Sequence, residues 1–147
     1  MRYLENKKAG LKYELLERLE AGIELLGTEV KAVKSRRGSF ESSFVIIRGG
    51  EAYLIGATIP PYQGTNAPKG YDPARNRRLL LTKKEIGELA GLEGKGLTIV
   101  PLAMYNKGRK IKLEIAAARG KKKHDKREAL RKREDERHID REMKERR

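Results

Sequence analysis

The chain has 147 residues and carries 35 Lys and Arg against 21 Asp and Glu, a formal net charge of +14. This length accommodates one modest domain, and the excess of positive charge points to a polyanionic partner such as RNA, DNA or an anionic membrane. The chain contains no Cys and only two His without metal-ligand spacing, which excludes disulfides and argues against a zinc enzyme.

A membrane protein is not expected. No apolar run approaches the ~20 residues that a spanning helix needs. The N-terminal segment is charged from residue 2 onward and offers no apolar signal-peptide region. Because the absence of Cys also suits a reducing compartment, we expect a cytoplasmic protein without a membrane partner.

The first third of the chain predicts a strand and a helix. Residues 13–19 fit either an amphipathic helix or a strand, because periodicity does not decide over so short a run. The alternation in Ile23-Glu24-Leu25 favours a strand that ends at Gly27. Thr28 then suits the N-cap of a short helix over residues 29–35.

The middle of the chain predicts a hairpin followed by a long loop. Residues 43–48 and 51–55 are rich in β-branched and aromatic residues. The pair Gly49-Gly50 between them tolerates the positive φ angles that a two-residue hairpin turn requires. Residues 60–73 are mainly Gly, Pro, Asn and Tyr and predict a surface loop.

The second half predicts one helix and three strands. Thr82 and Glu85 have the spacing of a capping box, which opens a helix that ends near Gly91. The odd positions from 111 to 115 are apolar and the even ones charged, as in a strand with one buried face. The predicted strands of this half are 79–81, 97–104 and 110–116.

In total, about six short strands and two short helices are separated by turns. Hairpins dominate and no βαβ repeat appears, which favours an antiparallel barrel or sandwich. We therefore predict a mainly β fold, an OB-type antiparallel barrel with short helices, because small Greek-key barrels of this type bind oligonucleotides. This body is expected to span residues 1–119.

Residues 120–147 are expected to form a separate basic tail. They contain thirteen Lys and Arg and eight Asp and Glu, and their few apolar residues cannot form a core. At 100° per residue, five cations lie within one ~80° sector, so a helix would have one basic face: Lys126, Arg133, Arg137, Arg141 and Lys144. We expect a tail that is disordered alone and helical against a polyanion, joined to the body through a flexible Gly120. The alternative is a solvated solubility tail.

Sequence signs of catalysis are few. The chain has no GxGxxG, no GxxxxGK[ST] and no GxSxG motif. A metal-dependent nuclease would need clustered carboxylates, and Asp72 is the only Asp before residue 120. We therefore expect no enzyme activity, no cofactor and no metal.

Ten short motifs occur in an order that resembles the SsrA-binding protein (small protein B) family, the tmRNA-binding factors of bacterial trans-translation. The resemblance extends from Glu5 to about Arg137. The motifs are Glu5-Asn6-Lys7-Lys8-Ala9, Glu20-Ala21-Gly22-Ile23, Gly27-Thr28-Glu29-Val30-Lys31, Pro61-Tyr62, Asp72-Pro73-Ala74-Arg75, Arg78-Leu79-Leu80-Leu81, Gly96-Leu97-Thr98, Pro101-Leu102, Ala118-Arg119-Gly120-Lys121-Lys122 and His124-Asp125-Lys126-Arg127-Glu128.

The resemblance implies a monomeric adaptor that delivers alanyl-tmRNA to stalled ribosomes. Its body would bind the tRNA-like domain of tmRNA, and its tail would fold as a helix in the empty mRNA channel near the decoding centre of the small subunit. The positions implied on the tmRNA side are Asn6, Lys7, Lys8, Glu29 and Lys31. Those implied on the ribosome side are Gly120, Lys121, Lys122, His124, Asp125, Lys126 and Arg127. The basic face of the tail adds Arg133 and Arg137 to the expected ribosome contacts.

Physical roles follow for some of these positions. The lysines are expected to contact phosphates, Glu29 to accept hydrogen bonds from an exposed base edge, and His124 to stack on an rRNA base. One departure from the family pattern stands at Gly10-Leu11-Lys12, where Arg-His-Asp/Glu is usual.

The alternative is a general OB-fold RNA-binding or ribosome-associated protein. Such a protein is expected to carry aromatic stacking residues along a groove. This chain has two Phe, no Trp and six scattered Tyr, so it is poor in them.

Overall fold

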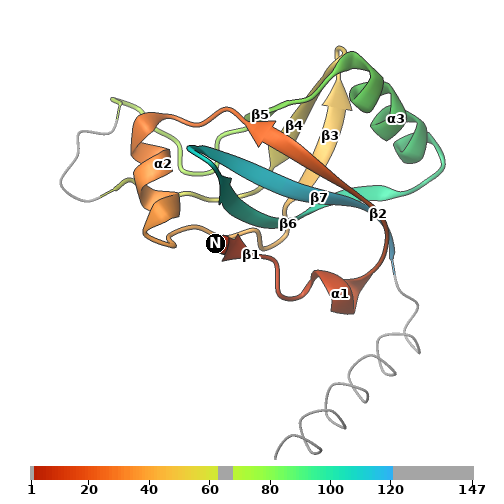
Figure 1. Cartoon of the computed structure of the whole chain (residues 1–147), viewed down its shortest axis with the longest axis horizontal. Helices are drawn as coiled ribbons and strands as arrows, with labels where there is room; N and C mark the ends of the chain where they lie inside the picture. Colours follow the sequence, from red (N-terminus) through yellow and green to blue (C-terminus); the bar gives the residue numbers. More distant parts are fainter. Residues whose placement is uncertain (1, 63–67, 121–147) are drawn as a thin grey trace, which may run out of the picture.

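The computed structural model describes residues 2–62 and 68–120, which contain seven strands and three helices (Figure 1). In chain order these are β1 (Arg2–Glu5), α1 (Ala9–Lys12), β2 (Tyr13–Ile23), α2 (Gly27–Lys34), β3 (Phe44–Arg48), β4 (Glu51–Ile55), β5 (Arg77–Leu80), α3 (Lys83–Gly94), β6 (Thr98–Lys107) and β7 (Lys110–Gly120). No helix in these ranges is long and apolar enough to cross a membrane.

The strands form one antiparallel sheet that closes into a ring. The hydrogen-bonded order is β6-β3-β4-β5-β2-β7, and β7 pairs again with β6. β3 and β6 are paired over a short length, because Val45 opposite Ile99 is the one residue pair that joins them in the described sheet. β1 lies outside the ring and pairs with the second half of β6 through residues such as Leu4, opposite Met104. The prediction of a mainly β, antiparallel fold with short helices is confirmed.

Several local predictions are confirmed in detail. Gly49 and Gly50 have φ angles of 58° and 74° and turn the chain between β3 and β4. In β7, Leu113 and Ile115 are fully buried, while the alternating charged residues Lys112 and Glu114 are partly exposed. Such alternation places one side of the strand in the core of the ring.

The N-terminus of α3 has the predicted capping box. The Thr82 hydroxyl accepts a hydrogen bond from the Glu85 amide at 3.2 Å, and the Glu85 carboxylate accepts one from the Thr82 amide at 2.9 Å. The helix ends at Gly94, one turn beyond the predicted end at Gly91.

The N-terminus of α2 differs from the prediction. Leu26, and not Thr28, is the N-cap residue, and the helix already begins at Gly27 and ends at Lys34. The reason is that the Glu29 carboxylate, in the first turn, accepts a hydrogen bond from the backbone amide of Leu26 at 2.7 Å. This bond fixes Leu26 at the N-cap. The Thr28 hydroxyl is buried and has no hydrogen-bond partner in the described part of the chain.

The structure also settles the N-terminal segment, where the sequence pattern was ambiguous. Residues 13–19 belong to the long strand β2, which pairs with β7 along most of its length. β1 and the one-turn helix α1 were not predicted, because β1 depends on pairing with β6, about 100 residues away in the chain.

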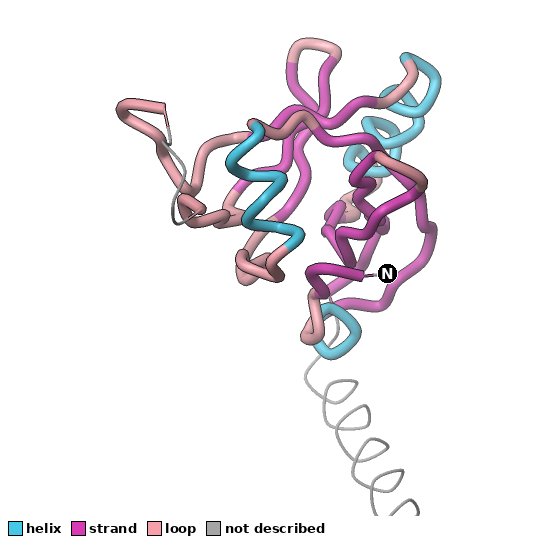
Figure 2. Tube along the Cα trace, turned by 60° about the vertical axis from the view of Figure 1, so that its left-hand side comes forward, coloured by secondary structure: helices cyan, strands magenta, loops and turns pink. Residues whose placement is uncertain are grey.

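Two apolar clusters stabilise the fold. The main one fills the ring, and its fully buried members include Leu54, Leu79, Ile99, Met104 and Leu113. The second is small and lies beneath α1, where Ala9 packs with residues of β6 and β7 such as Leu102 and Ala118. α1 is thereby attached to the end of the ring at which the described chain ends (Figure 2).

Candidate nucleic-acid interface

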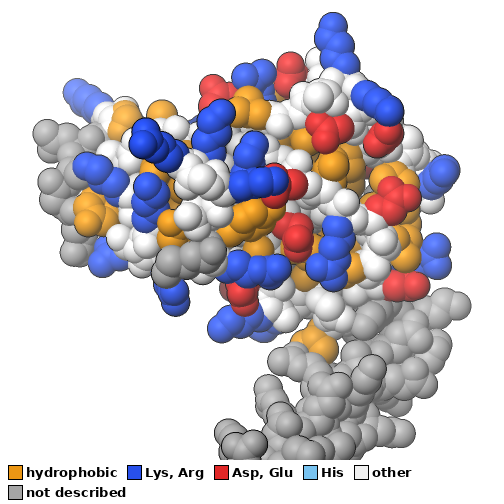
Figure 3. All heavy atoms as spheres, in the orientation of Figure 1, with side chains coloured by type: hydrophobic (Ala, Val, Ile, Leu, Met, Phe, Trp, Pro, Cys, Tyr) orange, Lys and Arg blue, Asp and Glu red, His pale blue; other side chains and the backbone are white. Residues whose placement is uncertain are grey.

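The C-terminal part of α2 carries a cluster of exposed cations. Figure 3 shows Lys and Arg side chains at both ends of the molecule, whereas the Asp and Glu side chains on this face lie mainly in the middle and away from the end that contains α2. The cations contributed by α2 and the residues after it are Lys31, Lys34, Arg36 and Arg37. We call these four residues the α2 cation cluster. Its density suits a phosphate backbone.

The turn between β1 and α1 contains the predicted residues Asn6, Lys7 and Lys8. The Asn6 amide donates to the Leu102 carbonyl at 2.8 Å, and its side chain donates to the Pro101 carbonyl at 2.9 Å. Asn6 therefore attaches the turn to β6. The side chains of Lys7 and Lys8 are exposed, as phosphate contacts require.

Gly120, the predicted joint between body and tail, lies at the end of the sheet. It is the last residue of β7 and pairs with Tyr13 at the start of β2, so the described body extends through residue 120. Flexibility between body and tail at this position stays a prediction, because Gly120 is the last residue of the described chain and the last pair of the ladder. The other predicted tail positions lie outside the described residues: Lys121, Lys122, His124, Asp125, Lys126, Arg127, Arg133 and Arg137.

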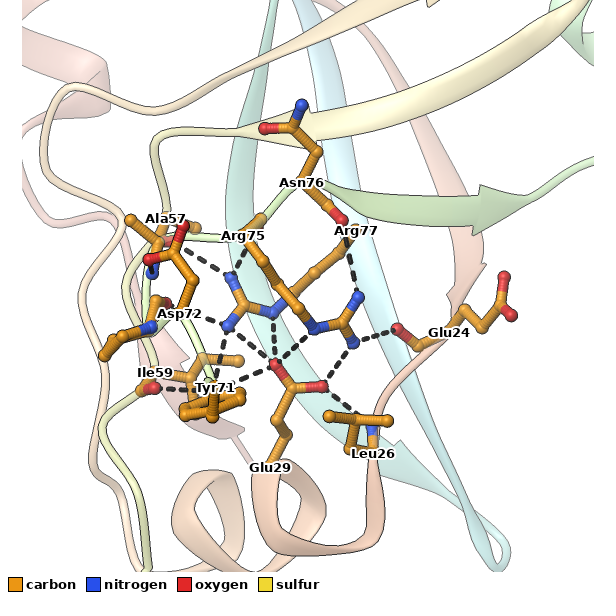
Figure 4. Close-up of polar contacts among 12 residues, drawn as sticks. Glu24, Leu26, Glu29, Ala57, Ile59, Tyr71, Asp72, Arg75, Asn76 and Arg77 are labelled. Atoms are coloured by element: carbon orange, nitrogen blue, oxygen red, sulfur yellow. Dashed lines mark hydrogen bonds and ion pairs between the residues drawn. The ribbon is translucent and has the colours of Figure 1, made fainter. Parts of the chain in front are cut away.

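Glu29 is the centre of a buried polar network that joins α2 to the segment before β5 (Figure 4). Its residue exposure is 1%, and its carboxylate forms ion pairs with Arg75 and Arg77. The Leu26 amide donates to Oε1 at 2.7 Å, and the Tyr71 hydroxyl lies 3.1 Å from Oε2. Both carboxylate oxygens are therefore occupied within the protein.

Arg77 is buried completely and still satisfies its donors. Its Nη1 atom donates to the carbonyls of Ala57 and Arg75, each at 3.0 Å. Its Nη2 atom donates to the Pro73 carbonyl at 2.9 Å and to the Tyr71 hydroxyl at 3.2 Å. One guanidinium thus fixes the path of the chain into β5, which suits the planar five-donor geometry of Arg.

The network changes the pKa values of its members. Burial opposes ionisation of Glu29, but hydrogen bonds from Arg75 and Leu26 and the charge of Arg77 outweigh it, so the pKa of Glu29 lies below 4.5. Burial and the charge of Glu29 raise the pKa of Tyr71 above 10. The hydrogen bond to Glu29 raises the pKa of Arg75. Glu29 is therefore a carboxylate and Arg75 a cation at neutral pH.

The direct base contact predicted for Glu29 does not fit this arrangement. A carboxylate with no exposed surface and two Arg partners has no oxygen to offer a base edge. The sequence pattern placed Arg75 in one of the family motifs and gave Arg77 no role. Their partner lies 46 and 48 residues earlier in the chain, so no local pattern could reveal the pairing.

Lys31, by contrast, is exposed two residues further along the same helix and belongs to the α2 cation cluster. Glu29 and Lys31 therefore face in different directions, one into the network and one toward solvent. In the described ranges, no group of three or more His, Asp or Glu side chains is placed to hold a metal ion.

The sequence and the structure of the chain are both similar to those of known proteins. A family model described as "SmpB protein" matches residues 3–145. SsrA-binding proteins from Gloeothece citriformis and Mesoplasma florum are 50% and 51% identical over 141 and 133 residues. These matches cover 95% and 90% of this chain and 91% and 89% of the relatives. A solved structure described as "tmRNA-SmpB: a journey to the center of the bacterial ribosome" is 44% identical, with a TM-score of 0.68, over 87% of this chain and 94% of that one.

Proposed function

The chain belongs to the SmpB protein family, and from this we propose that it binds tmRNA and acts with it in trans-translation on stalled ribosomes. The observation that carries the proposal is identity near 50% along almost the full length of both chains. As an adaptor of this kind, the protein would act in the cytoplasm and would itself catalyse no reaction.

The body is proposed to bind the tRNA-like domain of tmRNA through two groups of exposed cations. One is the pair Lys7 and Lys8 in the turn before α1, and the other is the α2 cation cluster, which includes Lys31. The two groups are neighbours, because α2 packs against β1, which leads into the turn. Phosphate contacts of this kind fix how a protein sits on RNA and supply much of the affinity.

Glu29 is proposed to act on binding indirectly, as a positioning residue. It holds the segment that contains Tyr71 and Arg75 against the first turn of α2. Loss of this attachment would change the direction in which α2 presents Lys31. In this proposal Glu29 contributes to RNA binding through contacts within the protein and not through a direct contact to a base.

Competition binding tests the function. We expect the purified protein to bind the tRNA-like domain of tmRNA much more tightly than bulk tRNA or duplex RNA in a fluorescence anisotropy assay at fixed salt. Equal affinity for all three RNAs would instead indicate a general RNA-binding protein and would contradict the proposal.

Residues 120–147 are proposed to act in the mRNA channel of the small ribosomal subunit, separately from the body. A chain that ends at Gly120 keeps every residue of the two apolar clusters described above. We expect this truncation to retain tmRNA binding and to lose tagging of nascent chains on stalled ribosomes. Loss of both activities together would contradict this division.

A further inference from the structure

A groove of about 510 Å³ lies between the N-terminal segment and the turn that precedes β3. One wall consists of residues 6–9 with Lys12 and Tyr13, and the other of residues 38–44. The groove is next to the α2 cation cluster, because Gly38 in its wall directly follows Arg37. It also lies at the end of the ring where Gly120 pairs with Tyr13.

The groove gathers aromatic side chains that are scattered along the sequence. The whole chain has two Phe and six Tyr, and both Phe and Tyr13 line this groove. Phe40 is buried, and Tyr13 is partly buried against the small cluster beneath α1. Phe44 differs, since 39% of its surface is exposed and it belongs to neither apolar cluster. Core packing therefore gives no reason for an aromatic ring at this position.

The position of Phe44 is well defined. It is the first residue of β3, and its neighbour Val45 is in the core, so the Phe44 side chain points to the other face of the strand. The preceding turn is held by two hydrogen bonds between Ser39 and Thr58, at 2.9 and 3.0 Å. The Ser43 hydroxyl adds a bond to the Phe40 carbonyl at 2.5 Å. These bonds fix the backbone that leads to Phe44, so this part of the groove needs little ordering when a ligand binds.

The charges around the groove favour an anionic ligand. Lys7, Lys8 and Lys12 line it and are exposed, against the two acidic residues Glu5 and Glu41. The α2 cation cluster increases the positive charge beside it. An aromatic ring surrounded by lysines is a common arrangement for an unstacked base with its flanking phosphates. The described chain ends at Gly120, which pairs with Tyr13 in the groove lining, but the sequence that follows has a net positive charge and suits the groove less.

We propose that this groove binds one unstacked nucleotide of the RNA, with the base stacked on Phe44 and its phosphates close to Lys7 and Lys8. The inference rests on the proposed function and adds a base-binding site to it. Stacking on an aromatic ring is tolerant of base identity, so the site would raise affinity without strong sequence preference.

Variants of Phe44 in the full-length protein test the groove. We expect Phe44→Ala and Phe44→Leu to weaken binding of the tRNA-like domain of tmRNA by on the order of 5- to 100-fold, and Phe44→Tyr to bind like the wild type. The matched control is Leu80→Ala, because Leu80 is 50% exposed and lies on β5 outside the groove. If Phe44→Ala binds the tRNA-like domain as tightly as the wild type, the groove is not a base-binding site, while the proposed function stands.

NMR of the wild type gives a second measurement that does not depend on a variant folding. With two Phe in the chain, selective labelling gives two sets of ring signals, and stacking should shift those of Phe44 upfield when the RNA is added. Unchanged Phe44 signals in the RNA-bound protein would overturn the inference. The Phe44 signals could also move when residues 121–147 are removed and stay unchanged when RNA is added. That result would overturn the inference and would indicate that the chain's own C-terminal segment occupies the groove. If the wild type binds no RNA, the groove and the proposed function both fail.

Discussion

Arg77 and Glu29 form an ion pair in which neither side chain has any exposed surface, with Nη2 of Arg77 2.7 Å from Oε2 of Glu29. The pair connects the first strand residue of β5 with the first turn of α2, 48 residues apart in the chain. Desolvation offsets much of the attraction in such a pair, so its net stabilisation is small. Removal of one partner is costly, however, because the other charge stays buried.

Glu29→Gln should therefore lower the free energy of unfolding by about 3 to 5 kcal/mol, since it leaves the Arg77 guanidinium buried without its counter-charge. Urea unfolding at pH 7 measures the change. Lys31→Gln on the same helix is the control, because an exposed lysine should change stability by less than about 0.5 kcal/mol. Arg75→Gln should cost less than Glu29→Gln, since 29% of the Arg75 side chain is exposed to water. Equal stability of Glu29→Gln and the wild type would contradict the structural role of the pair.

The same residue predicts a pH dependence. The pKa of Glu29 is lower in the folded protein than its ordinary value of 4.5, so the unfolded state binds the proton more tightly. The stabilisation from Glu29 is thus fully present above pH 4.5 and is lost as the pH falls through the lower, folded pKa. Urea unfolding of wild type and Glu29→Gln between neutral and acid pH should show a constant difference above pH 4.5 that narrows below it. A difference that stays constant down to acid unfolding would show that this carboxyl does not titrate as described.

Binding of the tRNA-like domain should weaken steeply with salt, because the proposed interface consists of lysine and arginine contacts to phosphate. Lys31→Gln should reduce the slope of log Kd against log salt concentration by about 0.7 to 1. The matched control is Lys84→Gln, an exposed lysine on α3 at the other end of the molecule from α2 (Figure 1). Equal slopes for the wild type and Lys31→Gln would remove Lys31 from the interface.

Two glycines should respond to Ala in opposite directions. Gly87 lies inside α3, and a Cβ there would meet no atom within 4 Å, so Gly87→Ala should stabilise the protein by about 1 kcal/mol. Gly56 has a φ of 82°, and its Cβ would lie 3.0 Å from the Ser42 carbonyl oxygen, so Gly56→Ala should destabilise it. Thermal unfolding gives the Tm of both variants relative to the wild type. A lower Tm for Gly87→Ala than for the wild type would contradict the placement of Gly87 inside α3.

The sequence by itself determined the features that depend on neighbouring residues. The alternation in β7, the Gly49-Gly50 turn and the capping box from Thr82 to Glu85 all appear in the structure where the pattern placed them. Each arises from interactions between residues at most five positions apart or from the backbone freedom of Gly, so a local pattern contains the information. The ordered series of short motifs also pointed to the family.

Only the tertiary structure decided the features that join distant segments. The polar network of Glu29 requires α2 and the segment before β5 to meet, and the ring closes where Val45 pairs with Ile99. The groove brings Tyr13 and Phe44 together although 31 positions separate them in the chain. A carboxylate expected to meet an RNA base proved to be buried, and three of the few aromatic residues proved to line one groove. Both outcomes follow from long-range packing of the sheet, on which sequence spacing carries no information.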